Sequence, residues 1–206
     1  MSLIKICGLT RKEDVQLAAK LGANFAGFIF AKKSPRYITK EQCAKISKNL
    51  PNSIRKVGVF VNEKPQTIND ICQRCQLDVV QLHGAESAEI LTKLNIDIIW
   101  KALPLRTPQE FEYAKNFPAN AILVDSIHNG EFGGTGKKCN WATAAKFAKL
   151  APLILAGGIT PQNIIAAYHE VKPFIIDLSS GVESCAGIKN HDKMYKLFNK
   201  INSIKE

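Results

Sequence analysis

Short apolar runs rich in β-branched residues alternate along the chain with longer amphipathic segments. The apolar runs predict strands at 3–6, 25–29, 55–60, 79–82, 98–102, 121–124, 153–155 and 174–177. The amphipathic segments predict helices at 12–21, 40–50, 65–75, 87–94, 108–117, 141–150 and 161–168, with a last helix at about 192–204. Three of these helices are expected to begin at a capping threonine, namely Thr39, Thr107 and Thr160.

This alternation predicts a parallel sheet, because apolar strands separated by helices are typical of sheets that are buried on both faces. About eight βα units follow one another, and no linker or low-complexity tract divides them. We therefore expect residues 1–206 to form a single domain of the α/β class, a (β/α)8 TIM barrel. A flavodoxin-like open sheet, the competing arrangement, has about five strands and would leave the remaining units unexplained.

Composition is that of a globular protein, since apolar residues make up 46% of the chain and charged residues 22%. No segment reaches the roughly 18–20 apolar residues that a membrane span needs. The first residues have neither the apolar core nor the cleavage site of a secretory signal. The sequence thus predicts a cytoplasmic protein with no membrane partner.

The formal net charge of +10 raises the alternative of nucleic-acid binding. The lysines are scattered, however, and are not gathered with aromatic residues as such a surface requires. We expect no nucleic-acid partner and interpret the lysines as a solvated surface whose field favours an anionic small-molecule substrate. Amphipathic helices fit either a monomer or a homodimer, so the oligomeric state stays open.

Six cysteines show no disulfide framework, and most are expected to be reduced and inert: Cys7, Cys43, Cys72, Cys75, Cys139 and Cys185. Cys72 and Cys75 form a C-x-x-C pattern, which is compatible with redox chemistry or with half of a zinc site. A second ligand pair at suitable spacing is missing, and the pair lies late in a predicted helix. We therefore expect no metal site.

In TIM barrels the catalytic groups lie where strands end and in the loops that follow. Cys7 follows the first predicted strand, beside a glycine that permits a tight turn, and Asp125 follows the sixth. Taken singly, Cys7 could be a buried structural thiol and Asp125 a cap or an ion-pair partner. Together, a thiol and a carboxyl group across one cavity can supply a base and an acid.

Small residues follow the last two predicted strands, where barrels often bind phosphate on backbone amides. They are Gly157 and Gly158 after the seventh strand, and Ser179, Ser180 and Gly181 after the eighth. Glycines also serve plain turns, but the two groups together favour a phosphate site.

Three further features lie at predicted strand ends. Arg36 follows the second strand and can meet a carboxylate with paired donors, and His83 follows the fourth. Either could instead be an ordinary surface or supporting residue. The glycine-rich segment 131–137 lacks the Walker A spacing and is typical of a mobile cover, although a plain surface connection has the same composition.

Over nearly its whole length the chain resembles the phosphoribosylanthranilate isomerase family. The segments that carry the resemblance are 5–8 (KICG), 34–37 (SPRY), 57–61 (VGVFV), 81–84 (QLHG), 124–125 (VD), 132–136 (FGGTG), 156–158 (AGG) and 177–183 (DLSSGVE). Their order and placement together are far more specific than any one of them.

The resemblance implies a cofactor-free Amadori rearrangement of N-(5′-phosphoribosyl)anthranilate in tryptophan biosynthesis. It implies that Asp125 is the general acid that protonates the ring oxygen and Cys7 the general base that removes the C2′ proton. The second role requires positive charge or dipoles to lower the pKa of the thiol. Arg36 and His83 are then substrate-binding residues, and Asp177 orients ribose hydroxyls.

Two other functions remain open at this point. A related sugar-phosphate isomerase of histidine synthesis has an aspartate in place of Cys7 and needs a second phosphate cradle, of which the loops after the third and fourth strands show no sign. A phosphate-binding barrel without catalysis is the other. The segment 186–192 departs from the family pattern, which has a proline before its glycine and Lys-Asp after it.

Overall fold

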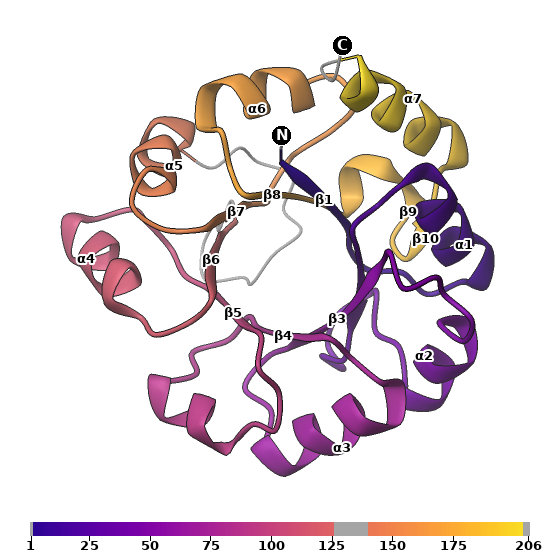
Figure 1. The fold of residues 1–206 in the computed structure, drawn as a ribbon, viewed down its shortest axis with the longest axis horizontal. Coiled ribbons are helices and arrows are strands. Elements are labelled where there is room, and N and C mark those ends of the chain that lie inside the picture. Colours follow the sequence, from indigo (N-terminus) through magenta and orange to yellow (C-terminus); the bar gives the residue numbers. More distant parts are fainter. Residues whose placement is uncertain (1, 126–139, 204–206) are drawn as a thin grey trace.

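The computed structural model describes residues 2–125 and 140–203. Eight parallel strands close a barrel in chain order, and helices form a ring around it (Figure 1). The strands are β1 (Leu3–Ile6), β2 (Phe25–Ile29), β3 (Arg55–Phe60), β4 (Val79–Leu82), β5 (Ile99–Ala102), β6 (Ala121–Val124), β7 (Leu153–Leu155) and β8 (Ile175–Leu178). The TIM-barrel prediction is confirmed, and only β5 and β8 differ from their expected bounds, by one residue.

The helices of the ring are α1 (Lys12–Leu21), α2 (Lys40–Ile46), α3 (Pro65–Cys75), α4 (Pro108–Asn116), α5 (Trp141–Ala148), α6 (Ile164–Val171) and α7 (His191–Asn202). The side chains of Thr39 and Thr107 cap α2 and α4, as predicted, and each cap is part of a capping box. Helix α1 packs against α7, so that the last helix completes the ring beside the first.

Three helix predictions need correction. Helix α2 ends at Ile46, four residues early, and the segment predicted at 87–94 is a 3-10 helix, η1 (Ala88–Lys93). Helix α6 is Ile164–Val171, three residues later at both ends than predicted, and its N-cap is Asn163 and not Thr160. The side chain of Asn163 accepts from the Thr160 amide and donates to the Gly158 carbonyl, which holds the segment before α6 as a turn.

A short antiparallel hairpin after β8 is absent from the predicted elements. It follows a 3-10 turn, η2 (Ser180–Val182), and consists of β9 (Glu183–Cys185) and β10 (Ile188–Lys189). Strands of three and two residues are too short to show an alternating pattern. Figure 1 shows this hairpin between the barrel and α1, near the end of β1.

Alternate side chains of each strand fill the barrel interior. Its lower part is apolar, with an edge-to-face contact between Phe25 and Trp100. Toward the carboxyl ends of the strands the inward residues become polar. In β1 the next inward residue after Leu3 is Lys5, and in β8 the next one after Ile175 is Asp177. A second apolar cluster fills the space between strands and helices. Within the described ranges, no helix has the length and apolarity to cross a membrane.

Candidate active site

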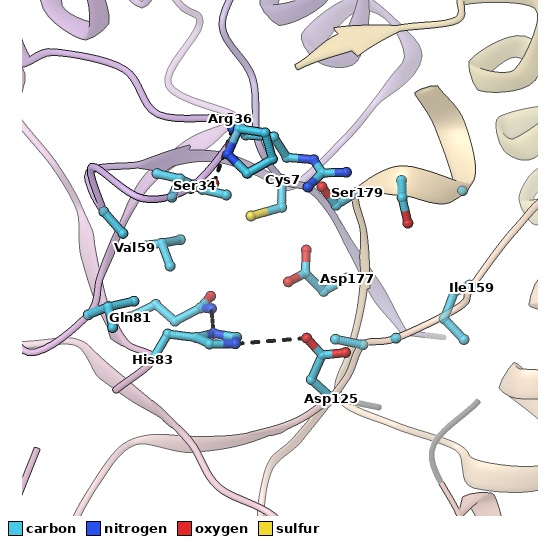
Figure 2. Close-up of a pocket in the computed structure, with 18 of the residues that line it drawn as sticks. Cys7, Ser34, Arg36, Val59, Gln81, His83, Asp125, Ile159, Asp177 and Ser179 are labelled. Carbon is cyan, nitrogen blue, oxygen red and sulfur yellow. Dashed lines mark hydrogen bonds and ion pairs between the residues drawn. The ribbon is translucent and has the colours of Figure 1, made fainter. Parts of the chain in front are cut away.

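A cavity of about 650 Å³ opens at the carboxyl ends of the strands, above the apolar layer. Its lining comes from the ends of most strands and the loops after them (Figure 2). All the predicted site residues line it: Cys7, Arg36, His83, Asp125, Gly157, Gly158, Asp177, Ser179, Ser180 and Gly181. The predicted cover at 131–137 lies outside the described residues.

Cys7 enters the cavity from the end of β1. The residue is only 6% exposed, and its backbone amide donates to the Leu178 carbonyl of β8 at 2.8 Å. A Cβ atom at Gly27 of β2 would lie 2.8 Å from the Cys7 sulfur. A glycine is therefore needed there, because any side chain would displace the thiol. Gly8 turns the chain after Cys7 at a φ of +73°.

Charged groups surround the Cys7 thiol. Its pKa is raised above the ordinary value, chiefly because burial disfavours the thiolate. The ammonium groups of Lys5 and Lys189 oppose this rise, whereas Asp177 adds to it. The lowered pKa that a thiolate base requires is thus not provided by the protein alone, since desolvation outweighs the neighbouring cations.

Lys5 and Asp177 form an ion pair beneath the thiol. The Nζ atom of Lys5, which is fully buried, donates to Asp177 Oδ2 at 2.7 Å. Burial is the largest influence on the pKa of Lys5 and lowers it, but Asp177 and Cys7 together raise it above its usual value. Lys5 therefore remains an ammonium directly below the position at which a thiolate would form.

Asp125 and His83 lie across the cavity from Cys7 (Figure 2). His83 Nε2 is 3.8 Å from Asp125 Oδ2, and both side chains are largely buried. The amide nitrogen of Gln81, 2.9 Å away, donates to His83 Nδ1, so the ring proton of the neutral imidazole is on Nε2. His83 thus presents an N–H toward the carboxyl group and the cavity.

We expect His83 to stay neutral above about pH 5, because its pKa is lowered to about 4. Burial is the main cause, and the charges of Lys5 and Lys101 contribute. The unfolded chain, with a histidine pKa of about 6.5, then binds the proton first, so folding stability falls as pH drops from about 6.5 to 4, by at most about 3 kcal/mol. The imidazole nitrogen shifts of His83, followed by NMR from pH 8 to 5, test this.

The matched variant for this titration is His83→Gln, which carries no titrating ring. Its unfolding free energy should decline less steeply than that of the wild type between pH 6.5 and 4. An imidazolium spectrum for His83 at pH 6 is the result that contradicts the assignment.

The loops after β7 and β8 meet at one side of the cavity. Gly157 and Gly158 adopt φ angles of +84° and +65°, which side chains of other residues rarely tolerate. Gly181, in η2, packs so closely on the Ile159 carbonyl that a Cβ atom would overlap it. The glycines therefore allow the two loops to pack together and bring their backbones to the cavity surface.

Arg36 lines the cavity but is also held by another residue. Its Nε atom lies 2.9 and 3.1 Å from the two carboxylate oxygens of Glu183, and its Nη2 atom lies 2.7 Å from Glu183 Oε2. Burial acts to raise the pKa of Glu183, but Arg36 and Lys189 outweigh it, so the pKa is lowered. Glu183 is thus a carboxylate that fixes the guanidinium.

Four buried polar atoms of the cavity have no hydrogen-bond partner among residues 2–125 and 140–203. They are Gln81 Oε1, His83 Nε2, Asp177 Oδ1 and Ser179 Oγ. Buried polar groups are normally satisfied, so these atoms mark positions where a polar ligand would gain hydrogen bonds.

Four residues around the site have no role predicted from the sequence: Lys5, Gln81, Glu183 and Lys189. The first two have a usable signal, because Lys5 and Gln81 lie two positions before Cys7 and His83 and must share their inward faces. Lys189 has none, since a single lysine in a loop is indistinguishable from a surface residue.

The C-x-x-C cysteines lie away from this site. Cys72 and Cys75 are on α3, in agreement with the predicted helix, and both are buried. The pKa of Cys72 is raised to about 12, first by burial and then by Cys75. In the part of the chain that the structure describes, no group of three or more His, Cys, Asp or Glu side chains is arranged to hold a metal.

Comparison with known proteins gives one consistent result. The family described as N-(5'phosphoribosyl)anthranilate (PRA) isomerase matches residues 4–200. The enzyme of that name from Geobacter sulfurreducens is 42% identical over 190 residues, which cover 92% of this chain and 93% of the relative. The one from a Thermoanaerobacter species is 38% identical over 205 residues, which is 100% of each chain to the nearest percent.

Solved structures agree. The phosphoribosyl anthranilate isomerase of Thermotoga maritima superposes with a TM-score of 0.90 at 38% identity, covering 98% of this chain and 100% of that one. A second structure, with a TM-score of 0.87 at 35% identity and the same coverage, is a complex of such an isomerase with reduced 1-(o-carboxyphenylamino)-1-deoxyribulose 5-phosphate.

Proposed function

The chain belongs to the N-(5′-phosphoribosyl)anthranilate isomerase family and has that activity, and we propose which of its residues carry out each step of the reaction. The reaction is an aldose–ketose isomerisation. It converts N-(5′-phosphoribosyl)anthranilate to 1-(2-carboxyphenylamino)-1-deoxyribulose 5-phosphate, a step of tryptophan biosynthesis. The first two proton transfers, one to the ring oxygen and one from C2′, take place on the ribose, so the site needs one acid and one base.

Asp125 is the general acid in this proposal. It enters the cavity from the end of β6, and its side chain is only 9% exposed. Protonation of the ribose ring oxygen opens the ring and leaves a Schiff base on the anthranilate nitrogen. The neutral His83, with its N–H on the Asp125 side, can hydrogen-bond to the opened ribose without competing for the proton.

Cys7 is the general base and removes the proton from C2′. The protein by itself favours the thiol, but the cationic Schiff base brings positive charge beside the sulfur. An added cation lowers the pKa of the thiol, and Lys5 already stands below it. The thiolate is therefore favoured at the stage of the reaction that needs it, and the enolamine then tautomerises to the ketone.

The remaining contacts hold the substrate. We assign the phosphate to the backbone around Gly157, Gly158, Ser179, Ser180 and Gly181, where two loops present amides at the cavity surface. Arg36 meets the anthranilate carboxylate, and Asp177 Oδ1, which is buried and without a partner among the described atoms, receives a ribose hydroxyl.

The observation that carries this proposal is the placement of Cys7 and Asp125 in one cavity, on strands β1 and β6. The test is turnover of phosphoribosylanthranilate, generated in place from anthranilate and phosphoribosyl pyrophosphate and followed by loss of its fluorescence. We expect the purified protein to remove the signal. Folded protein without turnover would leave the rival, a phosphate-binding barrel without catalysis, which inorganic phosphate would still occupy.

We infer that the chain works in the cytoplasm, as one catalytic domain, on a small-molecule substrate and without a nucleic-acid partner. A monomer or a homodimer fits equally with the ring of helices. A Thermotoga maritima relative whose structure has been solved as monomers is described as dimeric, which supports testing for a homodimer.

A further inference from the structure

Two charged side chains of the β9–β10 hairpin are buried against the active site. The side chain of Lys189 is fully buried, and that of Glu183 is 4% exposed. Removing charges from water is costly, and the cost is offset only where the pair has close geometry and further hydrogen bonds. We propose that Glu183 and Lys189 are positioning residues, Glu183 for Arg36 and Lys189 for Cys7. This inference rests on the proposed function, in which Cys7 is the general base and Arg36 binds the substrate carboxylate.

Lys189 connects the hairpin to the ends of two barrel strands. Its Nζ atom donates to the carbonyl of Cys7 at 2.6 Å and to that of Ser179 at 3.2 Å. It also forms the ion pair with Glu183 Oε1, at 2.8 Å. An ammonium group has three protons, and these contacts use all of them. Lys189 therefore fixes the backbone on which the base is carried.

Glu183, the acidic partner in this ion pair, also binds Arg36. Its carboxylate binds the Nε and Nη2 edge of Arg36, and its Oε1 atom also accepts from the Gly187 amide at 3.3 Å. A guanidinium has a second edge, formed by Nη1 and Nη2, that can bind another carboxylate with two parallel hydrogen bonds. Because Glu183 occupies the first edge, it orients the second edge for the substrate carboxylate.

The hairpin itself is anchored away from the cavity. The backbone amide of Lys189 donates to Asp14 Oδ2 on α1 at 3.1 Å. Asp14 in turn binds Arg11 at 2.8 Å and His191 at 2.8 Å. This buried carboxylate ties β10 to α1 and to the first residue of α7. Lys189 and Glu183 are thus held by two helices, which gives them the rigidity that a positioning role demands.

Charge gives Lys189 a second effect. Its ammonium lies close enough to Cys7 to oppose the rise in the thiol pKa. Burial lowers the pKa of Lys189, and Glu183 counteracts this by stabilising the charged form. Loss of the Lys189 charge is therefore expected to raise the pKa of Cys7. After loss of the Glu183 charge Lys189 still has its two carbonyl contacts, whereas Arg36 loses its carboxylate partner, so the larger effect falls on Arg36.

The test separates the two residues by kinetics. For Glu183→Gln we expect KM to rise about 10-fold with kcat changed less than about threefold, because the carboxylate-binding edge loses its orientation.

For Lys189→Met we expect kcat at neutral pH to fall about 10-fold and the acidic limb of the pH–rate profile to move up by about one unit. Lys189→Arg, which keeps the charge, should restore the profile. Exposed residues of α6 and α7 provide the controls Glu170→Gln and Lys196→Met.

Alkylation of the Cys7 thiol reports its pKa without substrate. Iodoacetamide alkylation of Cys7 is followed against pH by mass spectrometry of the tryptic peptide 6–11, which contains no other cysteine. We expect the alkylation midpoint to move to higher pH in Lys189→Met and to stay in place in Lys196→Met. This result decides the effect of Lys189 on Cys7 even if no variant turns the substrate over, so it can fail independently of the proposed reaction.

An unchanged alkylation midpoint in folded Lys189→Met overturns the role of Lys189. Equal changes of kcat and KM in Glu183→Gln, or no change in either, overturn the role of Glu183. If Lys189→Met does not fold, Lys189→Gln takes its place, because its amide removes the charge and keeps two hydrogen-bond donors at this position.

Discussion

Cys7→Ser is expected to lower kcat by about 10³-fold or more at neutral pH, because a general base contributes about 10²–10⁴-fold and a serine hydroxyl is a far weaker one. The substitution keeps the size of the side chain within the close contact with Gly27. KM should change little, because the substrate is held by its phosphate and carboxylate groups and the sulfur contacts neither of them. Steady-state kinetics in the fluorescence assay, with circular dichroism to verify folding, measure both.

Cys72→Ser is the control for this experiment. Cys72 is also a buried cysteine, but it lies on α3 away from the cavity, so the variant should retain wild-type kcat. Because the pKa of Cys7 is raised by burial, wild-type activity should also rise with pH on the acidic limb, and Cys7→Ser should lose this dependence. A Cys7→Ser enzyme that retains a tenth of the wild-type kcat contradicts the assignment of the base.

The barrel is predictable because its strands are buried on both faces and therefore stand out as continuous apolar runs. Once the barrel is expected, its topology brings the residues after every strand to one end. For this reason the sequence alone predicts that Cys7 and Asp125, which are 118 positions apart in the chain, lie in the same cavity.

The features that the sequence does not predict depend on contacts between distant segments. The pairing of Arg36 with Glu183, 147 positions later, follows from a hairpin whose strands are too short to leave a pattern. Helix α6 begins later than predicted because the side chain of Asn163 hydrogen-bonds to the backbone of Thr160 and Gly158 and holds this segment as a turn. Thr160 is therefore not the residue at which the helix starts. The direction of the Cys7 pKa is likewise not readable from the sequence, since it results from a balance between burial and the neighbouring charges.

Asp125→Asn is expected to lower kcat by about 10²–10⁴-fold, the range that general acids contribute. The amide has the shape of the carboxyl group and can hydrogen-bond in its place, but it has no acidic proton for the ribose ring oxygen. Its loss therefore blocks ring opening, the step before Cys7 acts, while the phosphate and carboxylate contacts still bind the substrate. Since the two residues serve successive steps of one reaction, the double variant with Cys7→Ser should be far less impaired than the product of the single effects.

Asp97→Asn, at an exposed position, should match the wild type. An Asp125→Asn enzyme within tenfold of wild-type kcat would instead assign the acid to another group, and the neutral His83, whose N–H points toward the same part of the cavity, would be the first to test.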